Sequence, residues 1–197
     1  MSETTTVWGI LAGGRGTRYG EPKATARYGD GTFLDHCLGV VRRCKSARDP
    51  IAVSVASDWS PVLSDDCIAV VDAEIDPGPA HSIGRLAEYA RSIDADLVVF
   101  AVDLLQVTPH TLARLGDRLC EQRLSDEPRV LVSWSGEREH WVLVGIPSAL
   151  TAAVATNAQS VSAIQVLLRL CPIEHFAVSA DELLDVNTPD QLPHGEN

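Results

Sequence analysis

The sequence predicts an α/β fold with three layers, in which helices cover both faces of a mostly parallel, twisted sheet. The main observation is that apolar runs of strand length alternate with segments of helical periodicity through residues 7–120. A second observation is the run at residues 97–102, whose nearly continuous apolar character is typical of a strand covered on both faces. Such sheets bind ligands beyond the carboxyl ends of their strands, so the loops at those ends are expected to carry function.

The first half of the chain contains four expected strands and three expected helices. The strands are short apolar runs at residues 7–11, 51–56, 67–71 and 97–102. A helix over residues 33–44 is expected because its apolar residues recur at helical spacing. Ser82 is expected to cap a helix over residues 83–93. Thr108 and Pro109 are expected to open the next helix, with threonine as the cap and proline at the first helical position.

The second half of the chain is less regular. Two strands are expected at residues 130–134 and 141–145, joined by a polar turn, and a last strand is expected at residues 173–178. Residues 147–155 and 161–170 are expected to be helical. Because no linker is long enough to divide the chain, residues 1–197 are expected to form a single domain.

Composition limits the classes of partner. The chain has 197 residues, of which 45% are hydrophobic, and a formal net charge of −11. This acidity argues against a nucleic-acid surface, because duplex binding depends on clustered Lys and Arg side chains. No stretch reaches the roughly 18 apolar residues of a membrane span, and the first residues lack the features of a secretory leader. The five scattered cysteines form no C-x-x-C pair, so structural zinc is not expected. Their odd number, without a secretory leader, indicates reduced thiols and a cytoplasmic protein.

A glycine-rich loop at residues 11–23 is the most informative feature of the sequence. It follows the first strand and contains four glycines within eight residues, together with two arginines and a lysine. Glycines let a backbone approach a ligand closely, and main-chain N–H groups with nearby cations bind phosphates. The P-loop does not fit, because Lys23 follows Pro22, and the dinucleotide fingerprint does not fit, because Tyr19 replaces its third glycine. We therefore expect the loop to bind a polyphosphate.

Two further segments offer oxygen ligands. Asp103 follows the buried strand at residues 97–102, at the same edge of the sheet as the glycine-rich loop. Asp185 and Asn187 lie two residues apart on an extended segment, so their side chains face the same side. Such oxygens suit Mg²⁺, which proteins hold through one or two carboxylates together with substrate phosphates. Taken alone, Asp103 could instead cap a turn, and the later segment could simply start a short helix at Thr188.

The glycine-rich loop resembles the nucleotidyltransferase signature L-A-G-G-x-G-x-R-x-G-x-x-K. Its defined positions are filled by Leu11, Ala12, Gly13, Gly14, Gly16, Arg18, Gly20 and Lys23. The resemblance implies a Rossmann-like fold and a metal-binding role for Asp103, although Leu104 and Leu105 replace the Met-Pro that often follows this aspartate. It also implies catalytic roles for Arg18, Lys23 and Asp103. The residues that it implies for nucleotide binding are Leu11, Ala12, Gly13, Gly14, Gly16, Lys23, Asp72 and Asp103.

Two other segments resemble one branch of these enzymes, the molybdenum cofactor nucleotidyltransferases. Residues 185–192 resemble that branch's ending, Asp-Ile-Asn-Thr-Pro-Glu-Asp-Leu, which implies that Asn187 binds the metal together with Asp103. Asp72, followed by Gly78-Pro79-Ala80, resembles the branch's acidic residue and its Gly-Pro-Leu-Ala-Gly segment. This match implies that Asp72 lies near the nucleoside.

The chain also departs from the branch at three positions. His81 and Ser82 stand where the branch has small residues and glycine. Trp141 replaces a proline in the strand that borders the acceptor pocket, and core packing is an alternative role for this tryptophan. Guanine selection would depend on loop contacts near Ser54, Ser57 and Asp58, which the sequence does not specify.

The best match is the molybdenum cofactor guanylyltransferase family. It implies Mg²⁺-dependent transfer of GMP from GTP to molybdopterin with release of pyrophosphate. Residues 7–120 would form the nucleotide-binding half and residues 121–192 the acceptor-binding half. The alternatives are a molybdenum cofactor cytidylyltransferase, another small sugar-phosphate-type nucleotidyltransferase, and a nucleotide-binding regulatory protein with the same fold. Neither nucleic acid nor a membrane is expected as a partner, and the protein is expected to be a monomer or a weak homo-oligomer.

Overall fold

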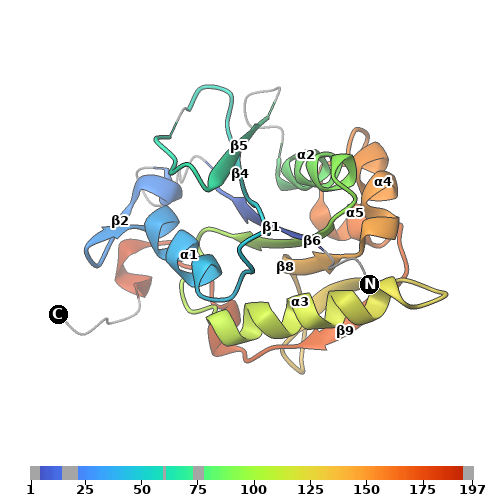
Figure 1. The fold of residues 1–197 in the computed structure, drawn as a ribbon. Coiled ribbons are helices and arrows are strands. Elements are labelled where there is room, and N and C mark those ends of the chain that lie inside the picture. Colours follow the sequence, from blue (N-terminus) through green and yellow to red (C-terminus); the bar gives the residue numbers. More distant parts are fainter. Residues whose placement is uncertain (1–4, 15–21, 60, 73–77, 193–197) are drawn as a thin grey trace.

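The structure is a computed structural model that describes residues 5–14, 22–59, 61–72 and 78–192. Its centre is a seven-stranded sheet with the order β5-β4-β1-β6-β8-β7-β9 (Figure 1). The strands of this sheet are β1 (Thr6–Leu11), β4 (Ile51–Val55), β5 (Cys67–Val71), β6 (Asp96–Ala101), β7 (Val130–Trp134), β8 (Glu139–Ile146) and β9 (Ile173–Ala177). All neighbouring pairs are parallel except those of β8, which runs antiparallel to β6 and β7. The predicted mostly parallel α/β fold is therefore confirmed.

Helices cover both faces of the sheet and create two apolar cores. One core lies under α1 and α3, and the other lies under α2, α4 and α5. The helices are α1 (Phe33–Arg42), α2 (Pro79–Ser92), α3 (Pro109–Arg123), α4 (Ser148–Asn157) and α5 (Ile164–Leu168). A small hairpin joins β2 (Arg27–Tyr28) to β3 (Gly31–Thr32), and short 3₁₀ turns form η1 (Lys23–Thr25), η2 (Asp181–Leu183) and η3 (Pro189–Gln191).

Polar caps and prolines determine where several helices begin. The Thr32 hydroxyl accepts from the backbone N–H of Asp35, and the Asp35 carboxylate accepts from the backbone N–H of Thr32, which completes a capping box for α1. Thr108 caps α3 in the predicted way, with Pro109 in its first turn. These caps satisfy N–H groups that the helices themselves leave unpaired.

Two expected helix boundaries were wrong. α2 begins at Pro79, with Gly78 as its N-cap at φ 90°, so Ser82 lies within the helix and does not cap it. The positive φ at Gly78 and the proline that follows it set the start of the helix earlier. α5 spans only Ile164–Leu168 instead of residues 161–170, because Ala163 is still extended and Pro172 follows closely.

The parallel strands place four chain segments at one edge of the sheet. β1, β4, β5 and β6 all point their carboxyl ends to this edge (Figure 1). The segments that follow the strands start at Ala12, Ala56, Asp72 and Val102.

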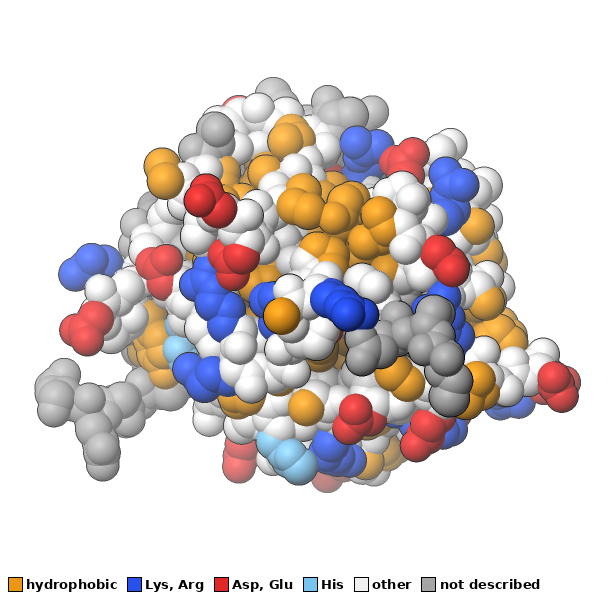
Figure 2. Space-filling view, viewed as in Figure 1, with side chains coloured by type: hydrophobic (Ala, Val, Ile, Leu, Met, Phe, Trp, Pro, Cys, Tyr) orange, Lys and Arg blue, Asp and Glu red, His pale blue; other side chains and the backbone are white. Residues whose placement is uncertain are grey.

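On the face drawn in Figure 2, acidic and basic side chains of the described residues are interspersed. None of the helices in the described residues is long and apolar enough to span a membrane.

Candidate active site

Three polar side chains from distant parts of the sequence meet at this edge of the sheet. The Lys23 ammonium donates to Asp103 Oδ2 at 2.6 Å and to Asn187 Oδ1 at 2.9 Å. These contacts join residues that are 80 and 164 positions apart. The side chains of Lys23 and Asp103 are 15% and 17% exposed, so the ion pair is shielded from bulk water but still accessible.

Buried neighbours and backbone hydrogen bonds hold each of the three residues in place. Lys23 opens η1, and the next residue, Ala24, is buried in the core. Asp103 follows the buried Val102, whose N–H donates to the carbonyl of Leu11 and so continues the β1–β6 ladder. The N–H of Val186, itself buried, donates to the carbonyl of Asp103 at 3.1 Å. The C-terminal segment is thereby anchored directly to the Asp103 loop.

The Asn187 amide has a defined orientation. Its Nδ2 donates to Asp185 Oδ2 at 2.6 Å, and its backbone N–H donates to Gln191 Oε1 at 2.8 Å. Because the amide nitrogen is directed at Asp185, the amide oxygen is left to face Lys23. This arrangement agrees with the prediction that residues 185 and 187 face the same side.

The donor set fits a hard cation. Asp103 and Asn187 both turn a side-chain oxygen toward one positively charged group, which is the arrangement that a divalent ion with oxygen ligands requires. Asp103 and Asn187 are the residues that would hold such an ion, and substrate phosphates would complete its ligands.

A second carboxylate, Asp72, follows β5 at the same edge. Asp72 is 1% exposed, and its Oδ2 accepts from Ser82 Oγ at 2.7 Å and from Ser54 Oγ at 3.4 Å. Oδ1 is buried and has no hydrogen-bond partner among the described residues. A Cβ placed on Gly13 would lie 3.5 Å from Asp72 Oδ2 and 3.5 Å from the backbone nitrogen of Ala56. The glycine-rich loop therefore starts directly beside Asp72.

The structure brings five of the ten predicted site residues into two groups. Lys23, Asp103 and Asn187 form one group, and Gly13 and Asp72 belong to the other. Leu11 ends β1, Ala12 is buried next to it, and Gly14 is exposed with open space around the position of a Cβ. Gly16 and Arg18 lie outside the described residues, so their expected roles stay predictions.

His36 supports the Asp103 loop, and this contact was not predicted from the sequence. Its Nε2 donates to the carbonyl of Leu105 at 2.9 Å, and its ring lies edge-to-face with Tyr28 at 4.9 Å between centroids. Burial lowers the pKa of His36, and the hydrogen bond to Leu105 opposes that shift. Leu105 stands where the signature often has proline, and the His36 bond restrains this position. No local pattern signals a contact across 69 positions.

Trp141 packs partly against the core under α2, α4 and α5, and the Arg169 guanidinium lies 5.0 Å from the centre of its ring. The alternative role in core packing therefore fits its surroundings.

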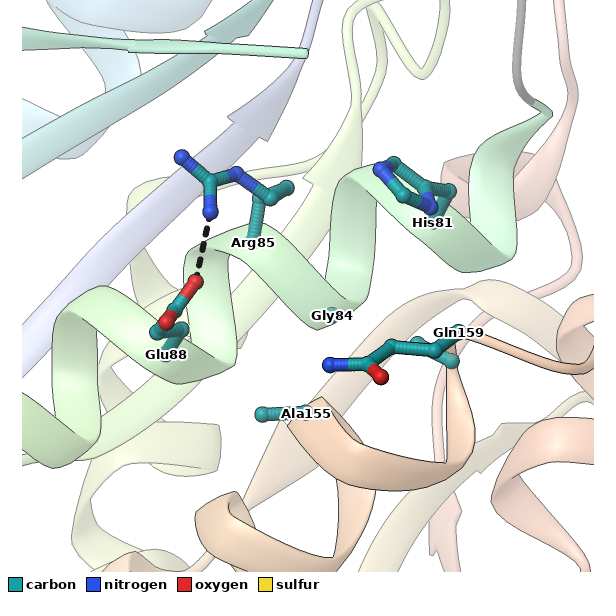
Figure 3. A pocket seen from close by; sticks show the side chains of 7 residues that line it. His81, Gly84, Arg85, Glu88, Ala155 and Gln159 are labelled. Atoms are coloured by element: carbon teal, nitrogen blue, oxygen red, sulfur yellow. Dashed lines mark hydrogen bonds and ion pairs between the residues drawn. The ribbon is translucent and has the colours of Figure 1, made fainter. Parts of the chain in front are cut away.

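A separate cavity of about 210 Å³ lies between α2 and α4 (Figure 3). Arg85 donates to Glu88 along α2, and Gln159 projects into the gap between the two helices (Figure 3). A Cβ on Gly84 would lie 2.3 Å from the Cβ of Ala158, so the helices are in close contact beside the cavity. The cavity is lined by His81, Gly84, Arg85, Glu88, Ala155, Ala158 and Gln159, and none of the predicted site residues is among them.

Comparison with known proteins identifies the family. Residues 8–175 match the family model described as the MobA-like NTP transferase domain. The chain belongs to this family. Its members are nucleotidyltransferases, which confirms the class of enzyme that the glycine-rich loop resembles. No curated protein shows a significant sequence match to this chain.

Three solved proteins illustrate the shared fold. Rv0371c from Mycobacterium tuberculosis H37Rv is 24% identical with a TM-score of 0.74, and the match covers 96% of each chain. Another structure of that protein, at 20% identity, TM-score 0.67 and coverage of 91% and 90%, is a complex with manganese. Molybdopterin-guanine dinucleotide biosynthesis protein A from Archaeoglobus fulgidus is 17% identical, with TM-score 0.70 and 93% of each chain covered. A 4-diphosphocytidyl-2C-methyl-D-erythritol synthase is 13% identical, with TM-score 0.70 and coverage of 96% and 95%.

Proposed function

We propose that this protein transfers GMP from GTP to the terminal phosphate of molybdopterin and releases pyrophosphate. The observation that carries the proposal is the convergence of Lys23, Asp103 and Asn187 beside the end of the glycine-rich loop. Family membership supports nucleotidyl transfer, and the likeness to the Archaeoglobus fulgidus protein supports a molybdopterin acceptor.

In this reaction an oxygen of the acceptor phosphate forms a bond to the α-phosphorus while the bond to pyrophosphate breaks. Two anions must meet, so positioning and neutralisation of charge account for most of the catalysis. Gly13 and Gly14 would direct backbone N–H groups at the triphosphate, and Lys23 would exchange its present oxygen partners for phosphate oxygens. No side chain has to remove a proton, because the acceptor phosphate is already ionised near neutral pH.

Asp103 and Asn187 would hold Mg²⁺, which when bound neutralises charge on the phosphates. The manganese complex of Rv0371C supports use of a divalent ion in this fold. Arg18, although outside the described residues, would add a second cation on the triphosphate.

A panel of nucleoside triphosphates with Mg²⁺ and molybdopterin tests the proposal, with pyrophosphate release as the measurement. We expect product with GTP, and an Asp103→Asn variant serves as the inactive control. Product with CTP alone would contradict the GTP assignment and favour the cytidylyl reaction, which the likeness to the 4-diphosphocytidyl-2C-methyl-D-erythritol synthase keeps as the second candidate. Nucleotide binding without pyrophosphate release would indicate a regulatory protein instead.

A further inference from the structure

The segment that follows β9 is fastened to the rest of the molecule before it reaches Asn187. The N–H of Val178 donates to the carbonyl of Trp134 at 3.0 Å, which continues the β7–β9 ladder by one bond. Leu183 and Val186 are each 2% exposed and belong to the core under α1 and α3. The route of this segment is therefore fixed by packing, and its polar contacts decide where Asn187 lies.

Glu182, in η2, binds the N-terminus of α3 across 74 positions of the sequence. Its Oε1 accepts from the backbone N–H of Thr108 at 3.0 Å and from Thr108 Oγ1 at 2.8 Å. Its Oε2 accepts from Thr111 Oγ1 at 3.0 Å. Hydrogen bonds to both oxygens hold the carboxylate in one orientation, and the N-terminus of a 15-residue helix favours a negative charge.

These bonds join the two short segments that carry the candidate metal ligands. Thr108 lies five positions after Asp103, at the end of the loop between β6 and α3. Glu182 lies five positions before Asn187. Near the ligands, the N–H of Val186 donates to the carbonyl of Asp103, and at the other ends of the segments Glu182 binds Thr108. The two segments are therefore fastened to each other at both ends.

We propose that Glu182 is a positioning residue for the metal site, because it ties the segment that carries Asn187 to the start of α3. This inference rests on the proposed function, in which Asp103 and Asn187 hold the divalent ion. Such an ion binds tightly only when its oxygen ligands keep a nearly ideal geometry. Glu182 is directed at α3, so it acts through the position of Asn187 and is not itself a ligand.

Glu174 offers a matched control on the same helix. It accepts from Arg118 Nε at 2.7 Å, from Arg118 Nη2 at 2.8 Å and from Gln122 Nε2 at 2.7 Å. Glu174 therefore joins β9 to α3 through three hydrogen bonds, as Glu182 joins the later segment, but Arg118 lies ten positions beyond Thr108. Loss of stability on detachment from α3 is expected in variants of either residue, whereas loss of metal affinity is expected only for Glu182.

The test measures Mn²⁺ affinity in the presence of GTP, from the electron paramagnetic resonance signal of free Mn²⁺. We expect Glu182→Ala to weaken Mn²⁺ binding about fivefold and Glu174→Ala to leave it within about twofold of the wild type. Glu182→Gln keeps an oxygen acceptor for Thr108 and should recover part of the affinity. In the metal-free protein, the Val186 amide should exchange its hydrogen faster in Glu182→Ala and at the wild-type rate in Glu174→Ala.

The outcomes separate this inference from the proposed function. Equal Mn²⁺ affinity in the wild type and Glu182→Ala, or an equal loss in Glu174→Ala, would overturn the inference, as would an unchanged exchange rate at Val186 in Glu182→Ala. The absence of Mn²⁺ binding by the wild type would overturn it too. Pyrophosphate release by the wild type is measured in parallel. If Glu182→Ala weakens Mn²⁺ binding but no pyrophosphate is released with any nucleotide and acceptor, the proposed function fails and the role of Glu182 stands.

Discussion

Asp72 and Asp103 occupy equivalent places in the sheet but have opposite surroundings. Each follows a parallel strand, β5 or β6, at the same edge. Asp103 is 17% exposed and pairs with an ammonium group at 2.6 Å, whereas Asp72 is 1% exposed and accepts only from hydroxyls of described residues. Position in the fold therefore brings a carboxylate to the site, and the neighbouring side chains determine what it can bind.

The difference in exposure and charge pairing between Asp103 and Asp72 corresponds to the two parts of a nucleotide, the charged triphosphate and the uncharged base. A partly exposed carboxylate that already faces a cation can exchange that cation for another when a charged ligand arrives. A buried carboxylate without a cation suits an uncharged donor, because bringing a second charge into that space would cost desolvation energy. We therefore expect Asp103 to act on the triphosphate and Asp72 on the base.

Replacing Asp103 should have the largest effect. We expect Asp103→Asn to lower kcat/KM for pyrophosphate release by about 10³-fold, since the variant keeps the shape of the side chain but loses its charge. Thermal unfolding should be nearly unchanged, which separates a catalytic loss from misfolding. Activity close to wild type would show that Asp103 takes no part in the reaction. The difference in role expected between Asp103 and Asp72 would then be contradicted.

Replacing Lys23 should have the next largest effect. Lys23→Ala removes a cation from the triphosphate and also leaves Asp103 without its partner, so we expect kcat/KM to fall about 10²-fold. Lys23→Arg restores the charge with a different shape and should recover part of the activity. Unaltered kinetics in Lys23→Ala would show that the ion pair is only structural.

A smaller effect is expected at His36, which touches the Asp103 loop but not the proposed substrate position. His36→Phe keeps an aromatic ring beside Tyr28 and removes the hydrogen bond to the Leu105 carbonyl. We expect kcat to fall by about fivefold with little change in KM, because a single lost bond loosens the loop by about 1 kcal/mol. A loss as large as that of Asp103→Asn would contradict a purely positioning role.

A third carboxylate, Asp96, lies at the start of β6 and extends the comparison. Asp96 opens β6, is fully buried, and accepts from the backbone N–H of Ser148 at 2.7 Å through one oxygen. Burial raises the pKa of Asp96, so its charged form costs stability in the folded state. This cost grows as pH rises above the unfolded pKa of about 3.9 and is complete above the raised folded pKa.

We therefore expect Asp96→Asn, which keeps an oxygen acceptor, to stabilise the protein toward urea at pH 7.5 and to have a smaller effect at pH 4. Pyrophosphate release should stay at the wild-type rate, because this end of β6 is opposite the site. A variant that is less stable than the wild type at pH 7.5 would show that the Asp96 charge is favourable.

Much of the fold and part of the site could be predicted from the sequence. Apolar runs located the strands closely because buried parallel strands leave a continuous apolar signal. The glycine-rich loop and Asp103 could be predicted because both follow strands whose carboxyl ends share an edge. Asn187 needed the family resemblance, since its local pattern fits a simple helix start equally well.

The remaining features depend on contacts that local sequence does not encode. Ser82 was predicted to cap a helix, but Gly78 and Pro79 start α2 earlier and direct Ser82 toward Asp72. His36 meets Leu105 only through the packing of α1 against the Asp103 loop. In both cases a residue that looked structural acquires its role from a partner on another element, which a single sequence does not identify.

The central claim is that Asp103 and Asn187 hold a divalent ion beside the triphosphate. The most direct test measures Mn²⁺ binding in the presence of GTP, with the electron paramagnetic resonance signal of free Mn²⁺ as the readout. We expect the wild-type protein to bind the ion beyond what GTP alone binds, and Asp103→Asn and Asn187→Ala each to weaken this binding at least about tenfold. Asp96→Asn, at the opposite end of β6 from Asp103, should bind the ion like the wild type. Equal Mn²⁺ binding by the wild type and Asp103→Asn would contradict the account.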